Sequence, residues 1–136
     1  MQTTITIWTV LAAAAVNMIV GFIWYGPLFG KMWKKLMGFT DVHMKSMRLS
    51  VAQAILLGCV TAVAMSYVLG HFVVFEGVTD VGRAWELAFW LWLGFFATTT
   101  AGSFIWEGKP FKLFLLNAAE QLVALFLMTL VFALWR

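Results

Sequence analysis

The sequence predicts an all-α fold class: an integral membrane four-helix bundle, built from two helical hairpins with an added interfacial amphipathic helix. Of the 136 residues, 63% are hydrophobic and only 11% are charged, whereas a soluble domain has roughly 45–50% apolar and about 25% charged residues. The mean hydropathy is +0.93. At about 20 residues per crossing, four crossings use nearly the whole length. Residues 1–136 are therefore expected to form a single transmembrane domain.

The first apolar run extends over about 5–26 and reaches Gly26-Pro27. Proline lacks a backbone N–H and disfavours helix in the residue before it, so we expect the helix to stop there. A cleaved signal peptide would begin with a positively charged segment, and no Lys or Arg precedes this run. The run is interpreted as a retained first span.

The segment over about 28–38 has the pattern of an amphipathic helix that crosses nothing. Apolar residues recur at helical spacing and lysines occupy the other side: Phe29, Met32, Trp33, Leu36 and Met37 against Lys31, Lys34 and Lys35. This pattern predicts a helix that lies on the inner leaflet and is closed by Gly38. It would serve either as an anchor between two spans, or in lipid sensing or docking of an anionic partner.

Three further apolar runs predict spans over about 49–73, 81–105 and 112–135. The pairs Thr40-Asp41 and Thr79-Asp80 are N-cap candidates for the second and third helices. Short polar side chains of this kind accept hydrogen bonds from the free N–H groups of a first helical turn.

Cationic residues predict the orientation of the spans. Only Arg83 and Arg136 lie in the outer segments, and the other seven lie between spans one and two or between spans three and four: Lys31, Lys34, Lys35, Lys45, Arg48, Lys109 and Lys112. Because cytoplasmic loops carry the excess of Lys and Arg, we expect both of those loops in the cytoplasm and both termini outside it.

Interface anchors are predicted at the inner boundary of the bilayer. Trp24, Trp33 and Trp106 flank that boundary, and tryptophan places an apolar ring and an N–H donor at the headgroup level. Lys31, Lys34 and Lys35 are expected to contact anionic headgroups at the cytoplasmic face.

A short repeated pattern suggests a parallel internal duplication of the two hairpins. Span one ends on Phe22-Ile23-Trp24 and span three on Phe104-Ile105-Trp106, each followed by Gly and a nearby Pro. Both helices run from outside to inside, so the pattern falls at equivalent depths. The alternative is coincidence, since such endings suit any span that meets the interface.

Small residues predict where the helices pack. They recur every four residues on span two, including Ala54, Gly58 and Ala62, and on span three, including Gly94 and Gly102. Close backbone approach through small residues promotes helix association in lipid. Span four has no such stripe, so we expect it to face lipid or a second copy.

Polar residues inside the spans are the candidate site. Glu120 is the acidic residue that lies well inside a span, and an ionised carboxylate there is costly unless it faces the bundle or finds a partner. Residues from all four spans fall at a similar depth: Glu120, Asn117, Gln121, Asn17, Gln53, Thr98 and Thr99. They predict either a polar pocket that is open toward the cytoplasm or a hydrogen-bond cluster that only fixes helix registry.

Other chemistries find little support. His43 and His71 lie near opposite faces of the predicted membrane, which leaves no paired-histidine metal spacing. No Ser-His-Asp or Cys-His arrangement can be assembled at one depth. We therefore expect no enzyme activity, no catalytic residues, no cofactor, no metal and no nucleic-acid partner.

Several strings resemble a known family. They are Trp24-Tyr25-Gly26-Pro27-Leu28-Phe29-Gly30-Lys31 with Trp33, then Met37-Gly38-Phe39-Thr40, Leu91-Trp92-Leu93-Gly94-Phe95, Glu107-Gly108-Lys109-Pro110, Lys112-Leu113-Phe114 and Asn117. The chain resembles the small bacterial four-span membrane proteins catalogued as domain of unknown function 1761, over nearly its whole length. The resemblance implies a multi-pass protein of the bacterial inner (plasma) membrane, and it supplies no catalytic residues.

Two functions follow from these observations as expectations. The first is a small transport or permeation component that uses the polar pocket around Glu120 and is at least a homodimer. The second is a structural or accessory subunit that packs against a larger membrane complex.

Overall fold

The computed structural model describes residues 5–38 and 49–135. Within these ranges the chain is helical and contains no β-strand. Four helical stretches are long and apolar enough to cross a membrane: Ile7–Leu28, Val51–Phe75, Val81–Ile105 and Phe111–Leu134. Each begins and ends within two residues of the range that hydropathy predicted. The all-α fold class is confirmed, and the protein is a multi-pass membrane protein.

The first span does not end at Gly26-Pro27 as predicted. Helix α1 (Ile7–Ile23) continues through the π-helical segment η1 (Trp24–Leu28). The Phe29 N–H donates to the Trp24 carbonyl, five residues back, at 2.9 Å. Proline removes one N–H donor and crowds the carbonyl of the preceding turn, and the wider π-helical turn accommodates it without ending the helix.

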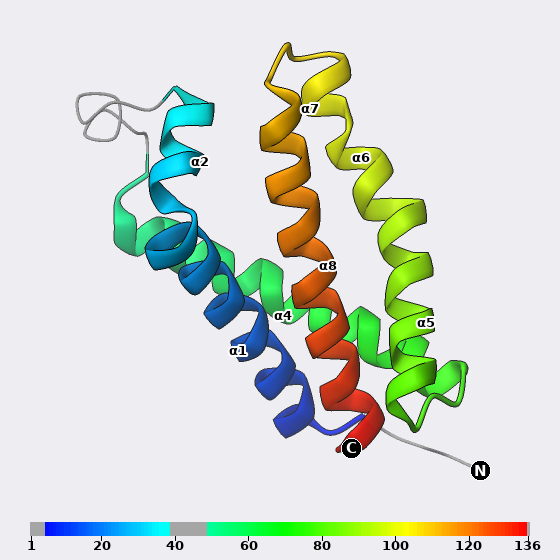
Figure 1. Cartoon of the computed structure of the whole chain (residues 1–136). Helices are drawn as coiled ribbons and strands as arrows, with labels where there is room; N and C mark the ends of the chain where they lie inside the picture. The colour runs from blue at the N-terminus through cyan, green and yellow to red at the C-terminus, as the bar shows by residue number, and fades with distance from the viewer. Residues whose placement is uncertain (1–4, 39–48, 136) are drawn as a thin grey trace.

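Helix α2 (Gly30–Met37) is the predicted amphipathic helix, and its three lysines are exposed. A Cβ at Gly30 would lie 2.7 Å from the Tyr25 carbonyl oxygen, so only glycine fits at this bend. Gly38 closes the helix with a φ of 76°, the left-handed conformation that glycine adopts freely. The helix runs alongside the first turns of α8 (Figure 1). This orientation differs from the predicted one, because a helix that lies flat on the inner leaflet would run across the spans.

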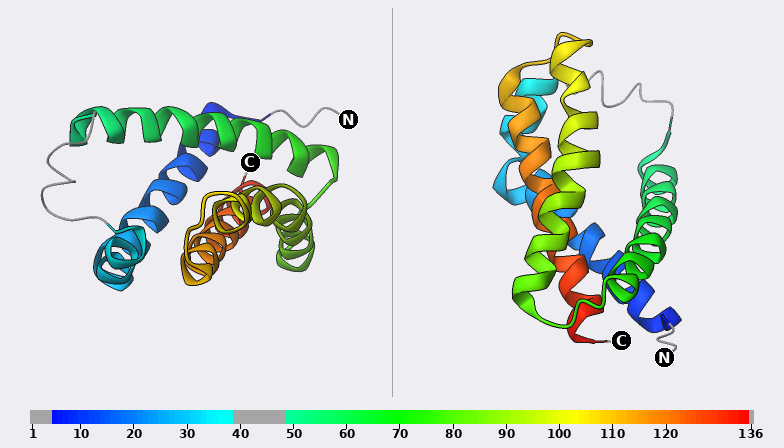
Figure 2. Two further views of the ribbon diagram at one scale, coloured as in Figure 1. Left: turned by 90° about the horizontal axis from the view of Figure 1, so that it is seen from above. Right: turned by 90° about the vertical axis from the view of Figure 1, so that its right-hand side faces the viewer.

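Helix α4 (Val51–Phe75) begins with a capping box. The Gln53 N–H donates to Ser50 Oγ at 3.1 Å, and the Ser50 N–H donates to Gln53 Oε1 at 3.0 Å. The predicted cap at Thr40-Asp41, together with Lys45 and Arg48, lies outside the described residues. Helix α4 crosses behind α1 and α8 (Figure 1), and seen from above it lies along one side of the other helices (Figure 2).

The third span is a chain of short helical segments: α5 (Val81–Leu91), η2 (Trp92–Ala97), α6 (Thr98–Thr100) and α7 (Gly102–Ile105). The predicted cap at its start is present, because the Arg83 N–H donates to Asp80 Oδ1 at 2.8 Å. The segment η2 is π-helical. The fourth span is the single helix α8 (Phe111–Leu134).

Helix α8 lies at the centre of the bundle, where it packs against α1, α4 and α5. The expectation that span four faces lipid or a second copy is therefore wrong for much of its surface, and α8 is the most buried of the four spans. Large side chains make its contacts: Leu113, Met128 and Phe132 are almost completely buried. Packing of large apolar groups replaces the small-residue stripe that the sequence lacks there.

The apolar core lies toward one end of the bundle. It contains Val10, Ala13, Leu69, Val73, Val78, Ala84, Ala88, Leu125, Met128, Phe132 and Ala133. The start of α1, the end of α8 and the turn between α4 and α5 lie at this end, whereas α2 and the turn between α7 and α8 lie at the other (Figure 1). The spans thus alternate in direction, and the α2 lysines share an end with Lys109.

The small residues of α4 divide into two groups. Ala62 and Gly70 are buried, and a Cβ at Gly70 would lie 2.7 Å from the Phe132 ring. A Cβ at Gly58 would make an ordinary contact of 3.5 Å with Met18, while Ala54 is exposed. Close approach through small residues is therefore restricted to the second half of this helix.

The two glycines of the stripe predicted on the third span, Gly94 and Gly102, do not pack against another helix among the described residues. A Cβ at Gly94 would meet no atom within 4 Å, and one at Gly102 would meet only Trp106, four residues later in the chain. Their spacing, a multiple of four residues, predicts a surface for contact with another helix, and no part of the described chain covers that surface.

The two segments of the suggested internal repeat differ in local structure. Trp24 begins η1 and the helix continues beyond it. Trp106 follows the end of α7 and is 85% exposed. The shared letters therefore do not produce a shared turn.

Candidate functional site

The polar turn of α8 (Asn117, Glu120 and Gln121) faces the inside of the bundle. These residues are three and four positions apart, a spacing that places them on one side of a helix. All three are half-buried in the protein. A carboxylate at this depth is thus removed from the lipid side of the bundle, as the cost of burying its charge requires.

A cavity of about 150 Å³ lies beside this turn, between α1, α4, η2 and α8. We call it the Glu120 cavity. Its lining residues are Asn17, Met65, Phe96, Glu120, Gln121, Ala124 and Leu125. At roughly 30 Å³ per water, it has room for a handful of water molecules or one small ligand.

Glu120 has no partner within the described chain. Its carboxylate accepts no hydrogen bond and pairs with no cation among residues 5–38 and 49–135. The Tyr25 hydroxyl interacts electrostatically with Glu120, but it carries no positive charge and donates its hydrogen to Asn117. An isolated carboxylate that borders a cavity is a site for a cation or a proton that comes from outside the chain.

Asn17 contributes an amide with weak partners. Its Nδ2 group donates to Met65 Sδ at 3.7 Å and to Met128 Sδ at 3.5 Å. Thioether sulfur is a weak acceptor, so the amide is poorly satisfied by the protein. A ligand in the Glu120 cavity would offer this side chain a better partner.

Two hydrogen bonds between helices hold the polar turn in place. The Tyr25 hydroxyl donates to Asn117 Oδ1 at 2.7 Å, and the Thr100 hydroxyl donates to Gln121 Oε1 at 2.9 Å. Because both bonds occupy the amide oxygens, the amide NH₂ groups remain available. The turn that carries Glu120 is thus fixed by η1 on one side and by α6 on the other.

Both π-helical segments supply an aromatic donor to α8. Tyr25 belongs to η1, and Trp92 begins η2 and donates its indole N–H to the Ala118 carbonyl at 2.8 Å. π-Helical turns occur often at functional sites, where they redirect side chains. Here they direct two aromatic side chains to adjacent positions of the turn that precedes Glu120.

Four residues predicted for the pocket do not line the Glu120 cavity. One is Asn117, whose amide oxygen accepts the hydrogen bond from Tyr25, and the other three bond within their own spans. Gln53 is exposed and forms the capping box of α4 instead. Thr98 and Thr99 are exposed, and their hydroxyls donate to carbonyls one turn back in the same span, Gly94 and Phe95. Each of these three satisfies its polar group locally, which explains why none of them reaches the cavity.

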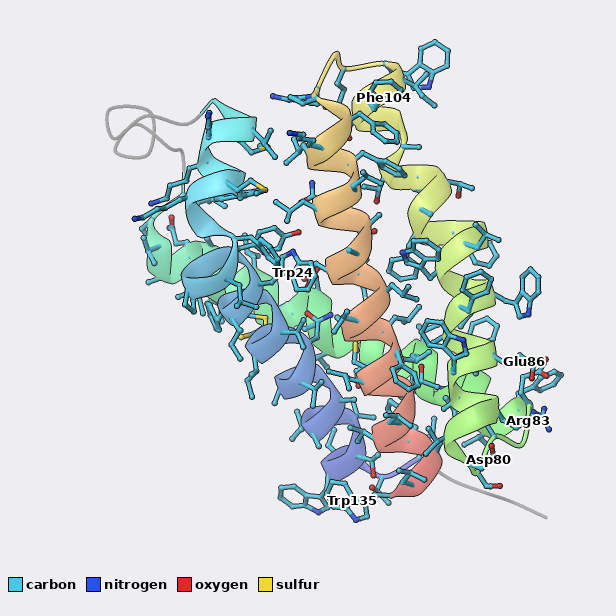
Figure 3. The ribbon with its side chains drawn as sticks, in the orientation of Figure 1. Trp24, Asp80, Arg83, Glu86, Phe104 and Trp135 are labelled. Carbon is cyan, nitrogen blue, oxygen red and sulfur yellow. The ribbon has the colours of Figure 1, made fainter. Side chains whose placement is uncertain are left out.

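Among the predicted interface anchors, Trp24 differs from expectation. Its indole points from η1 toward α8 (Figure 3), and its Nε1 is buried with no hydrogen-bond partner among the described residues. A headgroup anchor would expose this N–H. Trp33 is half-buried and packs against Tyr25 at a tilt, with ring centroids 5.5 Å apart, whereas Trp106 is exposed.

Sequence reasoning missed Tyr25 as a member of this region, although it lies within the string that carries the family resemblance. A hydroxyl on an aromatic ring at the depth of Asn117 was the available signal. Thr100 follows the predicted Thr98 and Thr99 directly in the sequence, and the sequence alone does not tell which threonine of this run faces α8.

No metal centre is formed by the side chains that the structure describes. Within residues 5–38 and 49–135, no group of three His, Cys, Asp or Glu side chains lies close enough to hold an ion. The Glu120 cavity offers one carboxylate and two amides, a donor set for a singly charged cation rather than for a tightly held divalent metal.

Comparison with curated proteins finds no match, and comparison with solved structures finds none either. A family model described as "Protein of unknown function (DUF1761)" matches residues 8–133. This match covers most of the chain, including every residue that lines the Glu120 cavity. The chain therefore belongs to the DUF1761 family of proteins of unknown function.

Proposed function

We propose that the protein is a small membrane transport or permeation component that takes up a cation in the Glu120 cavity. One observation carries the proposal: the Glu120 carboxylate borders a 150 Å³ cavity and has no cationic partner in the described chain. Intramembrane carboxylates with this placement commonly mark ion or proton pathways.

The neighbouring groups favour a cation over a neutral polar ligand. Burying an ionised carboxylate without a partner in a poorly solvated site costs about 3 kcal/mol or more in free energy, as for a charged side chain at the bilayer centre. A bound cation removes that cost, and a neutral molecule does not. The amide oxygen of Asn17, which accepts no hydrogen bond from the described residues, would add a second oxygen ligand.

The direction of access follows from the charge distribution. The proposal places α2 and Lys109 at the cytoplasmic face of a bacterial inner membrane, because Lys and Arg concentrate in cytoplasmic segments. The apolar core lies at the opposite, outer end. This arrangement supports entry of the cation from the cytoplasmic half.

A second candidate is an accessory role in a larger assembly, either with copies of itself or with another membrane protein. Gly94 is exposed, a Cβ added there would meet no atom within 4 Å, and Thr98 lies one turn later on the same side. Small residues that face lipid provide a surface for close helix approach. Native purification with a stoichiometric larger partner would favour this role over transport.

The proposal is tested by uptake of radiolabelled cations into proteoliposomes. The probes are sodium, rubidium, tetramethylammonium and hexyltrimethylammonium, each compared with empty liposomes. The variants are Glu120→Gln and the matched control Glu107→Gln, which alters an exposed carboxylate in the turn before α8.

We expect at least one probe to enter through the wild type and the control, and to enter about tenfold more slowly through Glu120→Gln, which corresponds to ~1.4 kcal/mol. Equal rates for Glu120→Gln and the wild type with every probe would contradict the proposal. Far-UV circular dichroism establishes that both variants are folded.

A further inference from the structure

A second, entirely apolar cavity adjoins the Glu120 cavity. It has a volume of about 320 Å³ and lies where α4 diverges from α5 and η2. We call it the apolar groove, and its lining residues are Met65, Val68, Leu69, Phe72, Leu91, Phe95, Phe96 and Leu125. Val68, Phe72 and Phe95 are 54%, 43% and 68% exposed, so the groove opens sideways on the surface of the bundle that faces the bilayer.

The two cavities are continuous in their lining. Met65, Phe96 and Leu125 belong to both. The Glu120 cavity alone is smaller than the sites that hold organic ligands, which are about 300–1,000 Å³. Taken together as one site, the two adjacent cavities reach that range and provide a polar part and an apolar part.

We propose that this joined site binds an amphipathic organic cation, with its ammonium group beside Glu120 and its apolar chain in the apolar groove. The inference rests on the proposed function, because it names the class of cation that the Glu120 cavity takes up. It adds to the proposed function that the apolar groove recognises the hydrocarbon part of the ligand.

Charge complementarity selects a cationic headgroup. An anionic amphiphile would place a second negative charge beside Glu120, and a neutral one would leave the carboxylate uncompensated. The residues at the junction suit a soft, weakly hydrated cation. Phe96 presents an aromatic ring, which attracts quaternary ammonium ions, and Met65 adds a flexible apolar side chain that adapts to the ligand.

The shape of the opening selects an apolar chain. All eight residues of the apolar groove are apolar, and the three exposed ones form its outer margin. A molecule that has partitioned into the bilayer can therefore enter between α4 and η2 without passing through the packed core. A strictly hydrophilic cation would gain nothing from this part of the site.

The test measures equilibrium binding to the full chain in lipid nanodiscs, with empty nanodiscs subtracted. Three probes separate the two halves of the site: hexyltrimethylammonium has both a cation and a chain, tetramethylammonium has only the cation, and hexyl sulfate has the chain with an anion. Because each buried methylene contributes about 0.8 kcal/mol, we expect hexyltrimethylammonium to bind at least about tenfold more tightly than tetramethylammonium. Hexyl sulfate should not bind.

Two variants of exposed α4 residues isolate the apolar groove. Val68→Trp fills it, whereas Val60→Trp adds the same bulk at a residue that is 58% exposed and lies outside the lining of either cavity. Neither residue is buried in the core, so both variants should fold. Val68→Trp is expected to weaken the binding of hexyltrimethylammonium about tenfold and to leave the binding of tetramethylammonium unchanged. Val60→Trp should change the binding of neither cation.

The outcomes separate the two claims. If Glu120→Gln weakens the binding of both cations but Val68→Trp weakens the binding of neither, the cation site stands and the role of the apolar groove is refuted. If hexyl sulfate binds as tightly as hexyltrimethylammonium, charge selection is refuted. If Glu120→Gln leaves both cations bound as in the wild type, the proposed function fails together with the inference.

Discussion

Replacement of Gly70 by alanine tests how closely α4 approaches α8. A Cβ at this position would lie 2.7 and 2.9 Å from two carbons of the Phe132 ring and 3.0 Å from Ile5 Cδ1. Contacts below 3.0 Å require a shift of one partner. Phe132 has no exposed surface, so its ring has no free space to move into and the helices must separate.

The size of the effect follows from comparison with Gly58→Ala in the same helix. There the new Cβ would meet the flexible end of Met18 at 3.5 Å, an ordinary contact. Both changes gain about 1 kcal/mol of helix propensity, which cancels in the comparison. The added methyl group at Gly70 overpacks the core, at about 1–3 kcal/mol. Gly70→Ala should thus be about 1–3 kcal/mol less stable than Gly58→Ala.

The assay is titration of SDS into mild-detergent micelles, with unfolding followed by far-UV circular dichroism. A double variant adds Phe132→Leu, which makes room for the new methyl group, so the two changes should cost less together than their sum. Gly70→Ala with the stability of Gly58→Ala, or strict additivity in the double variant, would refute the close contact between α4 and α8.

Three further predictions concern single contacts and the orientation. Tyr25→Phe removes the 2.7 Å hydrogen bond to Asn117 and should destabilise the folded state by about 1 kcal/mol in the same titration. Ser66→Ala removes the 2.7 Å hydrogen bond from a buried hydroxyl to the Val10 carbonyl, and it should destabilise the folded state by ~0.6 kcal/mol. A cysteine in place of Lys34, in α2, should react with a membrane-impermeant maleimide only in inside-out vesicles.

Matched controls exist for each of these changes. Tyr67→Phe alters an exposed tyrosine, and Thr61→Val alters an exposed threonine that bonds only within its own helix. Both should leave stability unchanged to within a few tenths of a kcal/mol. A cysteine at the exposed Glu76, in the turn that the predicted orientation places outside, should react only in right-side-out cells. Labelling of both cysteine positions from one side would contradict the predicted orientation.

Much of the fold follows from hydropathy, because lipid requires each crossing to be a long apolar helix with all its backbone groups paired. The helix caps were equally readable: Asp80 caps the third span as predicted. Ser50-Val51-Ala52-Gln53 has the capping-box pattern of a helix start, a signal that assigns Gln53 to the cap of α4 rather than to a pocket. These features depend on residues that are close in sequence.

The arrangement of the helices could not be predicted in the same way. The central position of α8 depends on how large residues such as Met128 and Phe132 interlock with three other helices. Hydropathy reports only that such residues avoid water, not whether protein or lipid covers them. The π-helical turn at Trp24–Leu28 also escaped prediction, because proline is compatible both with a helix end and with a widened turn.

The candidate site was predictable in its centre and not at its edges. The spacing of Asn117, Glu120 and Gln121 requires a shared helix face, and the charge of Glu120 requires that face to turn inward. Which threonine of the run from 98 to 100 faces α8 depends on the rotation of the third span, which the π-helical segment η2 alters.

The most direct measurement of the central claim is protection of Glu120 from dicyclohexylcarbodiimide, an apolar reagent that modifies carboxyl groups. Mass spectrometry of the protein in nanodiscs would report modification of Glu120 and of the exposed Glu107. We predict that hexyltrimethylammonium slows modification of Glu120 at least about fivefold, which requires some 80% occupancy of the site, and leaves that of Glu107 unchanged. If Glu120 is modified at the same rate in the presence and in the absence of hexyltrimethylammonium, the result would contradict a cation site at this carboxylate.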